Sequence, residues 1–180
     1  LIHRSYANER NAKSIPDNER LEFLGDAVLQ LCISDFLMKR YPDYAEGRLS
    51  KLRSSLVNEK PLAELAMEFN IGDYMLLGRG EENSGGRTKQ SLLSNTLEAV
   101  IAAVYLDGGL AECDRFIKRH FTPMIDNGSQ KVLYTDYKTA LQEKSQKLYK
   151  ETPAYSLIEE SGPDHDKTFS VEMTLAGSIK

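Results

Sequence analysis

Two long runs of hydrophobic positions dominate the first two thirds of the chain, and both predict buried helices. The first covers residues 19–40 and ends at Tyr41-Pro42, where the proline disfavours a helical conformation in the residue before it. The second covers 88–106 and ends at Asp107-Gly108-Gly109. Apolar residues at helical spacing predict three shorter helices, at 46–58, 60–69 and 110–121.

The pattern changes in the last third of the chain. Pro, Gly, Asn and Ser in residues 123–135 are typical of a linker. A helical pattern over 136–150 is followed by alternating polar and apolar positions at 154–160 and 167–175, which predict two strands. Because one helix and two strands cannot cover both faces of a sheet, we expect this second domain to be incomplete in the sequence.

Carboxylates interrupt the two apolar helices, where an unpaired charge is costly. At about 100° per residue, Glu19, Glu22 and Asp26 share one face of the first helix. Asn95 and Glu98 form an i, i+3 pair on the second. Since both helices must pack together to bury their apolar sides, the two polar stripes can face each other. Oxygen ligands without His or Cys favour Mg²⁺ or Mn²⁺ over Zn²⁺.

These acids have other interpretations. Isolated carboxylates on helices are usually solvated or paired with a nearby base, for which Arg20 is available. Inward glutamates of helix bundles also bind pairs of iron ions, but those sites normally include Glu-x-x-His. The three histidines of the chain lie in neither stripe. The pattern favours a metal site and leaves its chemistry open.

Composition narrows the class of protein. The 180 residues are 41% hydrophobic and 28% charged, which is usual for a soluble globular protein. No run of about 18 uncharged apolar residues predicts a membrane span. The net charge of −4 taken alone counts against a nucleic-acid partner, but acids gathered around a metal would explain it. Cys32 and Cys113 fall within helical patterns and are expected to be reduced, core-filling thiols, which favours a cytoplasmic protein.

One segment is specific enough to indicate a family. ERLEFLGDAVL, at 19–29, resembles the signature of the ribonuclease III family. Four further blocks resemble that family in the same order: HRSYANE at 3–9, EGRLSKLRSSLV at 46–57, LLGRGEENSGG at 76–86 and SLLSNTLEAVIAAVYLDGG at 91–109. DYKTALQEK and GPDHDKTF, near the end, resemble the start of a double-stranded-RNA-binding domain.

The resemblance implies a fold class, domains and an activity. We expect an all-α endonuclease domain at 1–122 that forms a homodimer, a linker at 123–135, and an α+β double-stranded-RNA-binding domain at 136–180. The order of the last domain would be α-β-β-β-α, truncated here. The implied activity is hydrolysis of phosphodiesters in double-stranded RNA, in RNA processing and maturation. Its products would carry 5′-phosphate and 3′-hydroxyl ends with short 3′ overhangs.

The resemblance also assigns roles to the acids. The implied catalytic residues are Glu19, Glu22, Asp26, Glu46 and Glu98, and the implied metal ligands are Glu22, Asp26, Asn95 and Glu98. The metal would be Mg²⁺, with Mn²⁺ as a substitute, activating water and neutralising charge on the phosphate. Glu19 and Glu46 match acids that the family places near the same cleft.

Asn95 departs from the family pattern, which usually has aspartate there. Asparagine keeps a carbonyl oxygen ligand but lacks the negative charge, so Mg²⁺ affinity should fall. Three explanations stay open: a natural variant that still works, an engineered inactivation, or a chain specialised for binding. We favour the working variant, and the alternative function is a non-cleaving dimer that binds double-stranded RNA.

RNA contacts are expected in both domains. In the second, the resemblance implies that Thr139, Gln142 and Glu143 enter one minor groove of the duplex and that His165 reaches the next. Without the resemblance, these residues would belong to a solvated helix face and a plain hairpin turn. In the first domain the candidate phosphate contacts are Arg48, Lys51, Arg53, Arg79, Arg87 and Lys89, each also explicable as a surface charge.

Two residues of the first helix are candidates for the dimer interface. Phe23 can pack in the core, or, as the family implies, insert into the partner subunit. Gly25 costs about 1 kcal/mol in a helix, which close approach of another backbone, most simply the partner's, would explain. The glycine-rich stretch 78–86 predicts a flexible loop near the substrate. It lacks the GxxxxGK[ST] spacing, so we expect no nucleotide cofactor.

Overall fold

The computed structural model describes residues 1–10, 16–135, 137–162, 167–175 and 178–179, with side chains except at 127–135, 137–140, 143 and 178–179. The chain forms two compact units, Leu1–Gln130 and Lys131–Lys180. In the part of the chain so described, no helix has the length and apolar character needed to cross a membrane.

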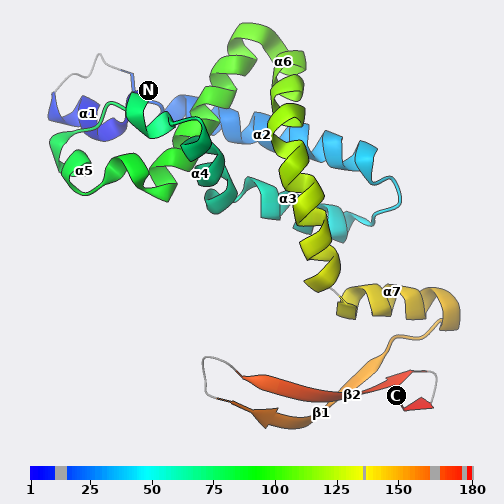
Figure 1. The fold of residues 1–180 in the computed structure, drawn as a ribbon. Coiled ribbons are helices and arrows are strands. Elements are labelled where there is room, and N and C mark those ends of the chain that lie inside the picture. The colour runs from blue at the N-terminus through cyan, green and yellow to red at the C-terminus, as the bar shows by residue number, and fades with distance from the viewer. Residues whose placement is uncertain (11–15, 136, 163–166, 176–177, 180) are drawn as a thin grey trace. The chain divides into compact units, whose positions relative to one another are not determined.

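Helices make up the first unit (Figure 1). In chain order its elements are α1 (Arg4–Glu9), α2 (Glu19–Arg40), α3 (Glu46–Val57), α4 (Glu59–Glu68), the 3₁₀ helix η1 (Ile71–Tyr74), α5 (Arg79–Asn83), the 3₁₀ helix η2 (Gly86–Thr88) and α6 (Gln90–Thr135). The bounds of α2 are those predicted from the hydrophobic run, and α3 and α4 agree with prediction within one residue at each end.

The long helix α6 consists of two helices that meet at Gly109. There the backbone adopts φ 74° and ψ −175°, which favours glycine, and Figure 1 shows the chain reversing direction. The predicted break is thus confirmed. The predicted end at 121 is wrong, because α6 continues through Pro123 to Thr135. Phe121 and Ile125, on either side of the proline, are fully buried, and their packing outweighs the lost backbone hydrogen bond.

The core of this unit lies between the apolar sides of α2, α4 and α6. Its largest fully buried side chains include Leu29, Ile33, Leu62, Leu97 and Ile101. Cys32 and Cys113 are both buried and free, which confirms the prediction of core-filling thiols. The C-terminal end of α2 is tied to the second half of α6 by an ion pair between Arg40 and Asp126, 2.7 Å long.

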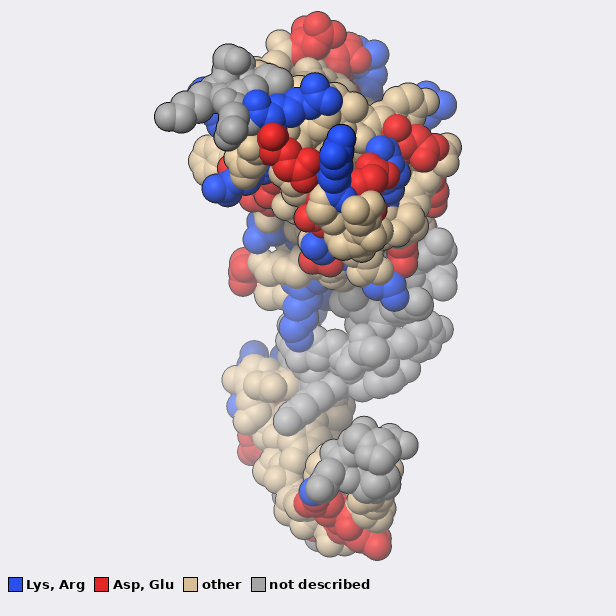
Figure 2. All heavy atoms as spheres, turned by 90° about the vertical axis from the view of Figure 1, so that its left-hand side faces the viewer, with Lys and Arg blue, Asp and Glu red and all other residues tan. Residues whose placement is uncertain are grey.

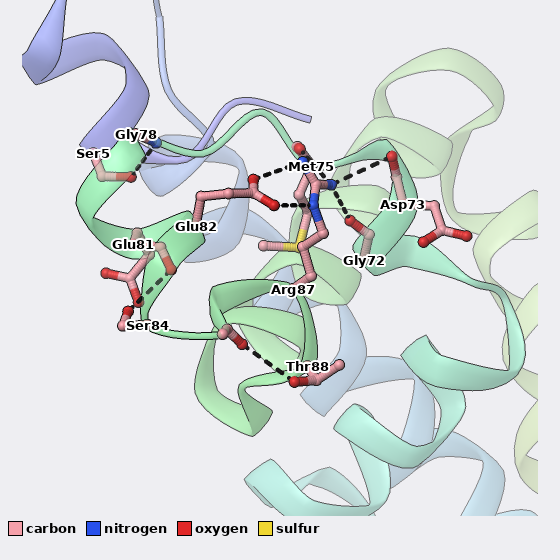
Figure 3. A network of polar contacts seen from close by, with 11 residues as sticks. Ser5, Gly72, Asp73, Met75, Gly78, Glu81, Glu82, Ser84, Arg87 and Thr88 are labelled. Atoms are coloured by element: carbon pink, nitrogen blue, oxygen red, sulfur yellow. Dashed lines mark hydrogen bonds and ion pairs between the residues drawn. The ribbon is translucent and has the colours of Figure 1, made fainter.

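The glycine-rich stretch predicted as a loop contains α5 and the start of η2, so the loop prediction is wrong for most of its length. Arg87 orders this stretch (Figure 3). Its Nε and Nη2 atoms donate to both carboxylate oxygens of Glu82 at 2.6 and 2.7 Å. Its Nη1 donates to the carbonyls of Gly72 and Met75 at 2.7 and 3.1 Å. A partly exposed guanidinium that binds both a carboxylate and backbone carbonyls, which no local pattern reveals, orders the stretch predicted to be flexible.

The second unit contains α7 (Tyr137–Tyr149) and an antiparallel sheet in the order β1 (Ala154–Ser161), β2 (Thr168–Leu175) and β3 (Ser178–Ile179). A bulge interrupts the register between Leu157 and Glu159. The predicted helix and two strands are confirmed, and a short third strand follows them. The fold class is therefore an all-α unit followed by an α+β unit.

Candidate functional site

The two acid-bearing helices touch backbone to backbone at Gly25. A Cβ atom built on this glycine would overlap the carbonyl oxygen of Glu98 on α6. The backbone that requires a glycine here thus belongs to the same chain, and the interpretation that it belongs to a partner subunit is wrong. The close approach places the polar stripes of α2 and α6 beside each other.

The side chains around this contact interact electrostatically. Burial, followed by the charges of Asp26 and Glu22, raises the pKa of Glu98 to about 7. Burial and the charge of Glu19 raise the pKa of Glu22, while a side-chain hydrogen bond with Asn95 opposes that rise. Such shifts arise where carboxylates are partly buried near one another. The four predicted metal ligands therefore lie on adjoining parts of α2 and α6, near enough for Glu22, Asp26 and Glu98 to influence one another's charge.

A cavity of about 250 Å³ opens beside these acids. Its lining residues are Glu19, Glu22, Asn95, Thr96, Leu92, Asn18 and the first residues of the chain, Ile2, His3 and Arg4. Arg4 Nη1 donates to Glu19 Oε1 at 2.9 Å. The base that pairs with the acidic stripe is therefore Arg4, where the sequence had suggested Arg20. The block at 3–9 carried part of the family resemblance, but no local pattern relates residue 4 to residue 19.

Two of the predicted catalytic acids, Asp26 and Glu46, do not line this cavity. Asp26 is exposed on α2, where it accepts a hydrogen bond from Gln30 Nε2 at 3.3 Å. Glu46 begins α3 and accepts a hydrogen bond from Ser50 Oγ at 2.7 Å. Glu46 does not line the cavity that Glu19 and Glu22 share. Its role near the cleft stays a prediction.

The oxygen ligands offered by these side chains match a hard divalent cation in chemical type, although their positions do not form a complete coordination site. Among the residues whose side chains the structure describes, no three carboxylates, imidazoles or thiols are grouped closely enough to hold a metal ion as they stand. Carboxylate and amide oxygens nevertheless make up the set that Mg²⁺ and Mn²⁺ prefer.

Phe23, on α2, is 82% exposed, so the alternative that it packs in the core of its own chain is wrong.

Of the predicted RNA contacts in the second unit, Gln142 is exposed on α7. The side chains of Thr139 and Glu143, and all of His165, lie outside the described residues.

Comparison with known proteins matches both units. The ribonuclease-III-like family matches residues 1–125, and the double-stranded RNA binding motif matches residues 137–179. Ribonuclease 3 of Syntrophobacter fumaroxidans is 52% identical over 183 residues, covering 99% of this chain and 76% of that protein. A solved nuclease domain of ribonuclease III from Campylobacter jejuni has 45% identity and a TM-score of 0.60, covering 67% of this chain and 83% of that chain.

A more distant likeness concerns the fold alone. The structure of Dicer from Pichia stipitis is 24% identical, with a TM-score of 0.57, and the match covers 91% of this chain and 76% of that one. The closer matches confirm the resemblance drawn from the sequence for both domains. Because the two family descriptions together span most of the residues, and a relative aligns over 99% of them, the chain belongs to the ribonuclease III family of endoribonucleases, with a double-stranded RNA binding motif after the nuclease domain.

Proposed function

We propose that the chain is a divalent-metal-dependent endoribonuclease that cuts double-stranded RNA, leaving 5′-phosphate and 3′-hydroxyl ends with short 3′ overhangs. The observation that carries this proposal is the group of interacting carboxylates where α2 meets α6, with the pKa of Glu98 raised to about 7. Glu22, Asp26, Asn95 and Glu98 would hold Mg²⁺, or Mn²⁺ in its place. The bound ion would supply an activated water and neutralise charge on the phosphate.

The residues of the chain prepare this site. The Glu98 backbone against Gly25 fixes the distance between the two helices, and therefore the span between the stripes. Glu22 and Glu98 are partly buried, and removal from bulk water strengthens the attraction of a carboxylate for a cation. Glu19 contributes a further acid at the cavity beside Glu22.

Asn95 is compatible with a working site. Its side chain hydrogen-bonds with Glu22 and favours the ionised carboxylate. Because a carboxylate only accepts, the amide must be the donor, which an aspartate in its place could not be. Asparagine removes one repulsive charge while keeping an oxygen that can face a cation. The second candidate, a dimer that binds double-stranded RNA without cutting it, is favoured only by the missing charge.

Cleavage of a long RNA duplex separates these functions. We expect the parent chain to shorten the duplex when Mg²⁺ is added and to stop in EDTA. Glu98→Gln should lose at least about a hundredfold in rate, whereas Glu64→Gln, which changes an exposed carboxylate of α4, should cut like the parent. Asn95→Asp should cut at lower Mg²⁺ concentrations. Cleavage by Asn95→Asp alone would establish the non-cleaving alternative, and parent-like cleavage by Glu98→Gln would contradict the proposed site.

RNA binding is also proposed for the second unit. Its match to the double-stranded RNA binding motif supports this, as does the exposed Gln142 on α7. Thr139, Glu143 and His165 are proposed to contact the minor groove with it.

A proposal about the cellular compartment is supported by the two thiols. Cys32 and Cys113 are buried and free. Unpaired buried cysteines suit a reducing environment, and we propose that the protein acts in the cytoplasm.

A further inference from the structure

The cavity beside the acid site contains a base that no predicted role uses. Among the described residues that line this cavity, Arg4 is the one permanently charged base, and it shares the lining with Glu19, Glu22 and Asn95. An arginine at the edge of an acidic site is suited to bind an anion that the acids alone would repel.

The backbone holds Arg4 at this place. Ile2 N–H donates to Asn18 Oδ1 at 3.1 Å, and Asn18 N–H donates to the Ile2 carbonyl at 2.9 Å. His3 N–H donates to the carbonyl of Leu76 at 3.1 Å. The chain start is thereby fastened both to the residue before α2 and to the segment after η1. Arg4 is consequently presented at the acidic N-terminal end of α2.

The guanidinium of Arg4 is held loosely. One hydrogen bond of 2.9 Å joins it to Glu19, and the two side chains are 62% and 53% exposed. Ion pairs with this exposure contribute little stability and exchange easily. Arg87 differs, since its Nε and Nη2 atoms bind Glu82 and its Nη1 binds backbone carbonyls (Figure 3). Arg4 is therefore the better placed of the two to contact a phosphate.

Figure 2 shows the face of this unit that carries α1 and α5, where basic and acidic side chains are intermixed. The face thus offers scattered cations rather than one broad basic patch. On such a surface the position of each basic side chain affects RNA binding more than the total positive charge does, because phosphate contacts are local.

We propose that Arg4 binds a non-bridging oxygen of a backbone phosphate beside the cleavage site, exchanging Glu19 for the phosphate. The inference rests on the proposed function. Glu19, Glu22, Asp26 and Glu98, when ionised, carry four negative charges, and one divalent cation would cancel two of them. The remaining charge repels a phosphodiester, and Arg4 offsets part of this repulsion by contacting the phosphate directly. A guanidinium also offers two parallel N–H donors to a phosphate.

The test uses the full chain and a short RNA duplex with steady-state cleavage in Mg²⁺ at several KCl concentrations. Arg4→Gln should raise KM roughly tenfold. It should also reduce the slope of log(kcat/KM) against log[KCl] by about one. Arg4→Lys, which keeps the charge, should keep the slope and lose part of the affinity. Arg10→Gln is the matched control, because Arg10 follows the same helix but stacks on Tyr6 at 4.4 Å.

Each outcome decides the proposal. An unchanged KM and salt slope in Arg4→Gln would overturn it. A lower kcat with the parent's KM and slope would make Arg4 a positioning residue for Glu19, which also overturns the phosphate contact. If the parent fails to cut, the proposed function fails. Duplex binding in EDTA, measured by fluorescence anisotropy, then tests Arg4 by the same change in slope. Melting curves identify any variant that does not fold. If Arg4→Gln does not fold, the salt dependence of kcat/KM in Arg4→Lys decides the proposal.

Discussion

Glu98 shows how a single residue reports on the site. Its carboxyl is partly buried beside Asp26 and Glu22, and its pKa rises to about 7 for that reason. The folded protein holds this proton more tightly than the unfolded chain, whose carboxyl has the ordinary value of 4.5. The resulting stabilisation is complete below that ordinary value and is lost as the pH rises through about 7.

We therefore predict a pH-dependent effect of Glu98→Gln on stability. In EDTA at about pH 8 the variant should melt several degrees above the parent, because the parent must keep a carboxylate ionised among other acids. The difference should vanish near pH 4.5, the ordinary value. Melting temperatures by calorimetry give the comparison, with Glu64→Gln as the exposed control. A difference that stays constant across this range would contradict the assigned electrostatics.

At the scale of elements, three short helices follow α4, and one of them, α5, occupies most of the stretch 78–86 that the sequence predicted to be a flexible loop. Segment 71–89 contains η1, α5 and η2, joined through Arg87. Glu9 of α1 adds a second fastening, since its carboxylate accepts from the backbone N–H groups of Arg79 and Gly80 at 2.8 and 3.2 Å. These contacts hold in place the segment that leads into the start of α6, the helix that carries Asn95 and Glu98.

Removal of the paired hydrogen bonds that Arg87 makes with Glu82 should increase local opening of segment 71–89 selectively. Arg87→Lys keeps the charge but cannot bind both oxygens of Glu82 and two backbone carbonyls together. We expect amide hydrogen exchange across segment 71–89 to accelerate roughly tenfold, with little change in α4. Lys89→Gln is the control, because its 3.2 Å ion pair with Glu81 is exposed. Equal exchange in Arg87→Lys and the parent would show that the segment is ordered by other contacts.

At the scale of the whole molecule, the nuclease unit exposes an apolar face over α2 and the bend of α6. Phe23, Leu31 and Leu106 are 82%, 56% and 63% exposed. Leu106 borders a depression together with Leu24, and Leu31 borders another together with Leu110, so apolar side chains of both helices line each depression. We propose that a second copy of the chain covers it, because large apolar patches mark interfaces.

Phe23→Asp should convert the dimer into monomers. A buried aromatic anchor at an interface is worth enough that its loss weakens association by at least about a hundredfold. Light scattering after size exclusion measures the mass across a dilution series. Tyr74→Asp serves as the control, because Tyr74 is 69% exposed on η1, away from the apolar face. A parent that is monomeric at all concentrations, or a Phe23→Asp variant that stays dimeric, would refute this assembly.

The sequence by itself determined where α2, α3 and α4 lie and which acids share a helix face. A hydrophobic run such as 19–40 forms a buried helix whichever other helix it packs against. The i, i+4 spacing places Glu22 and Asp26 on one helix face, and the i, i+3 spacing does the same for Asn95 and Glu98. Only the tertiary structure decided which surfaces meet. It placed the Glu98 backbone against Gly25, and joined Arg4 to Glu19 across fifteen positions. Local patterns encode hydrophobic period and turn preference, whereas contacts between distant residues depend on how whole helices pack.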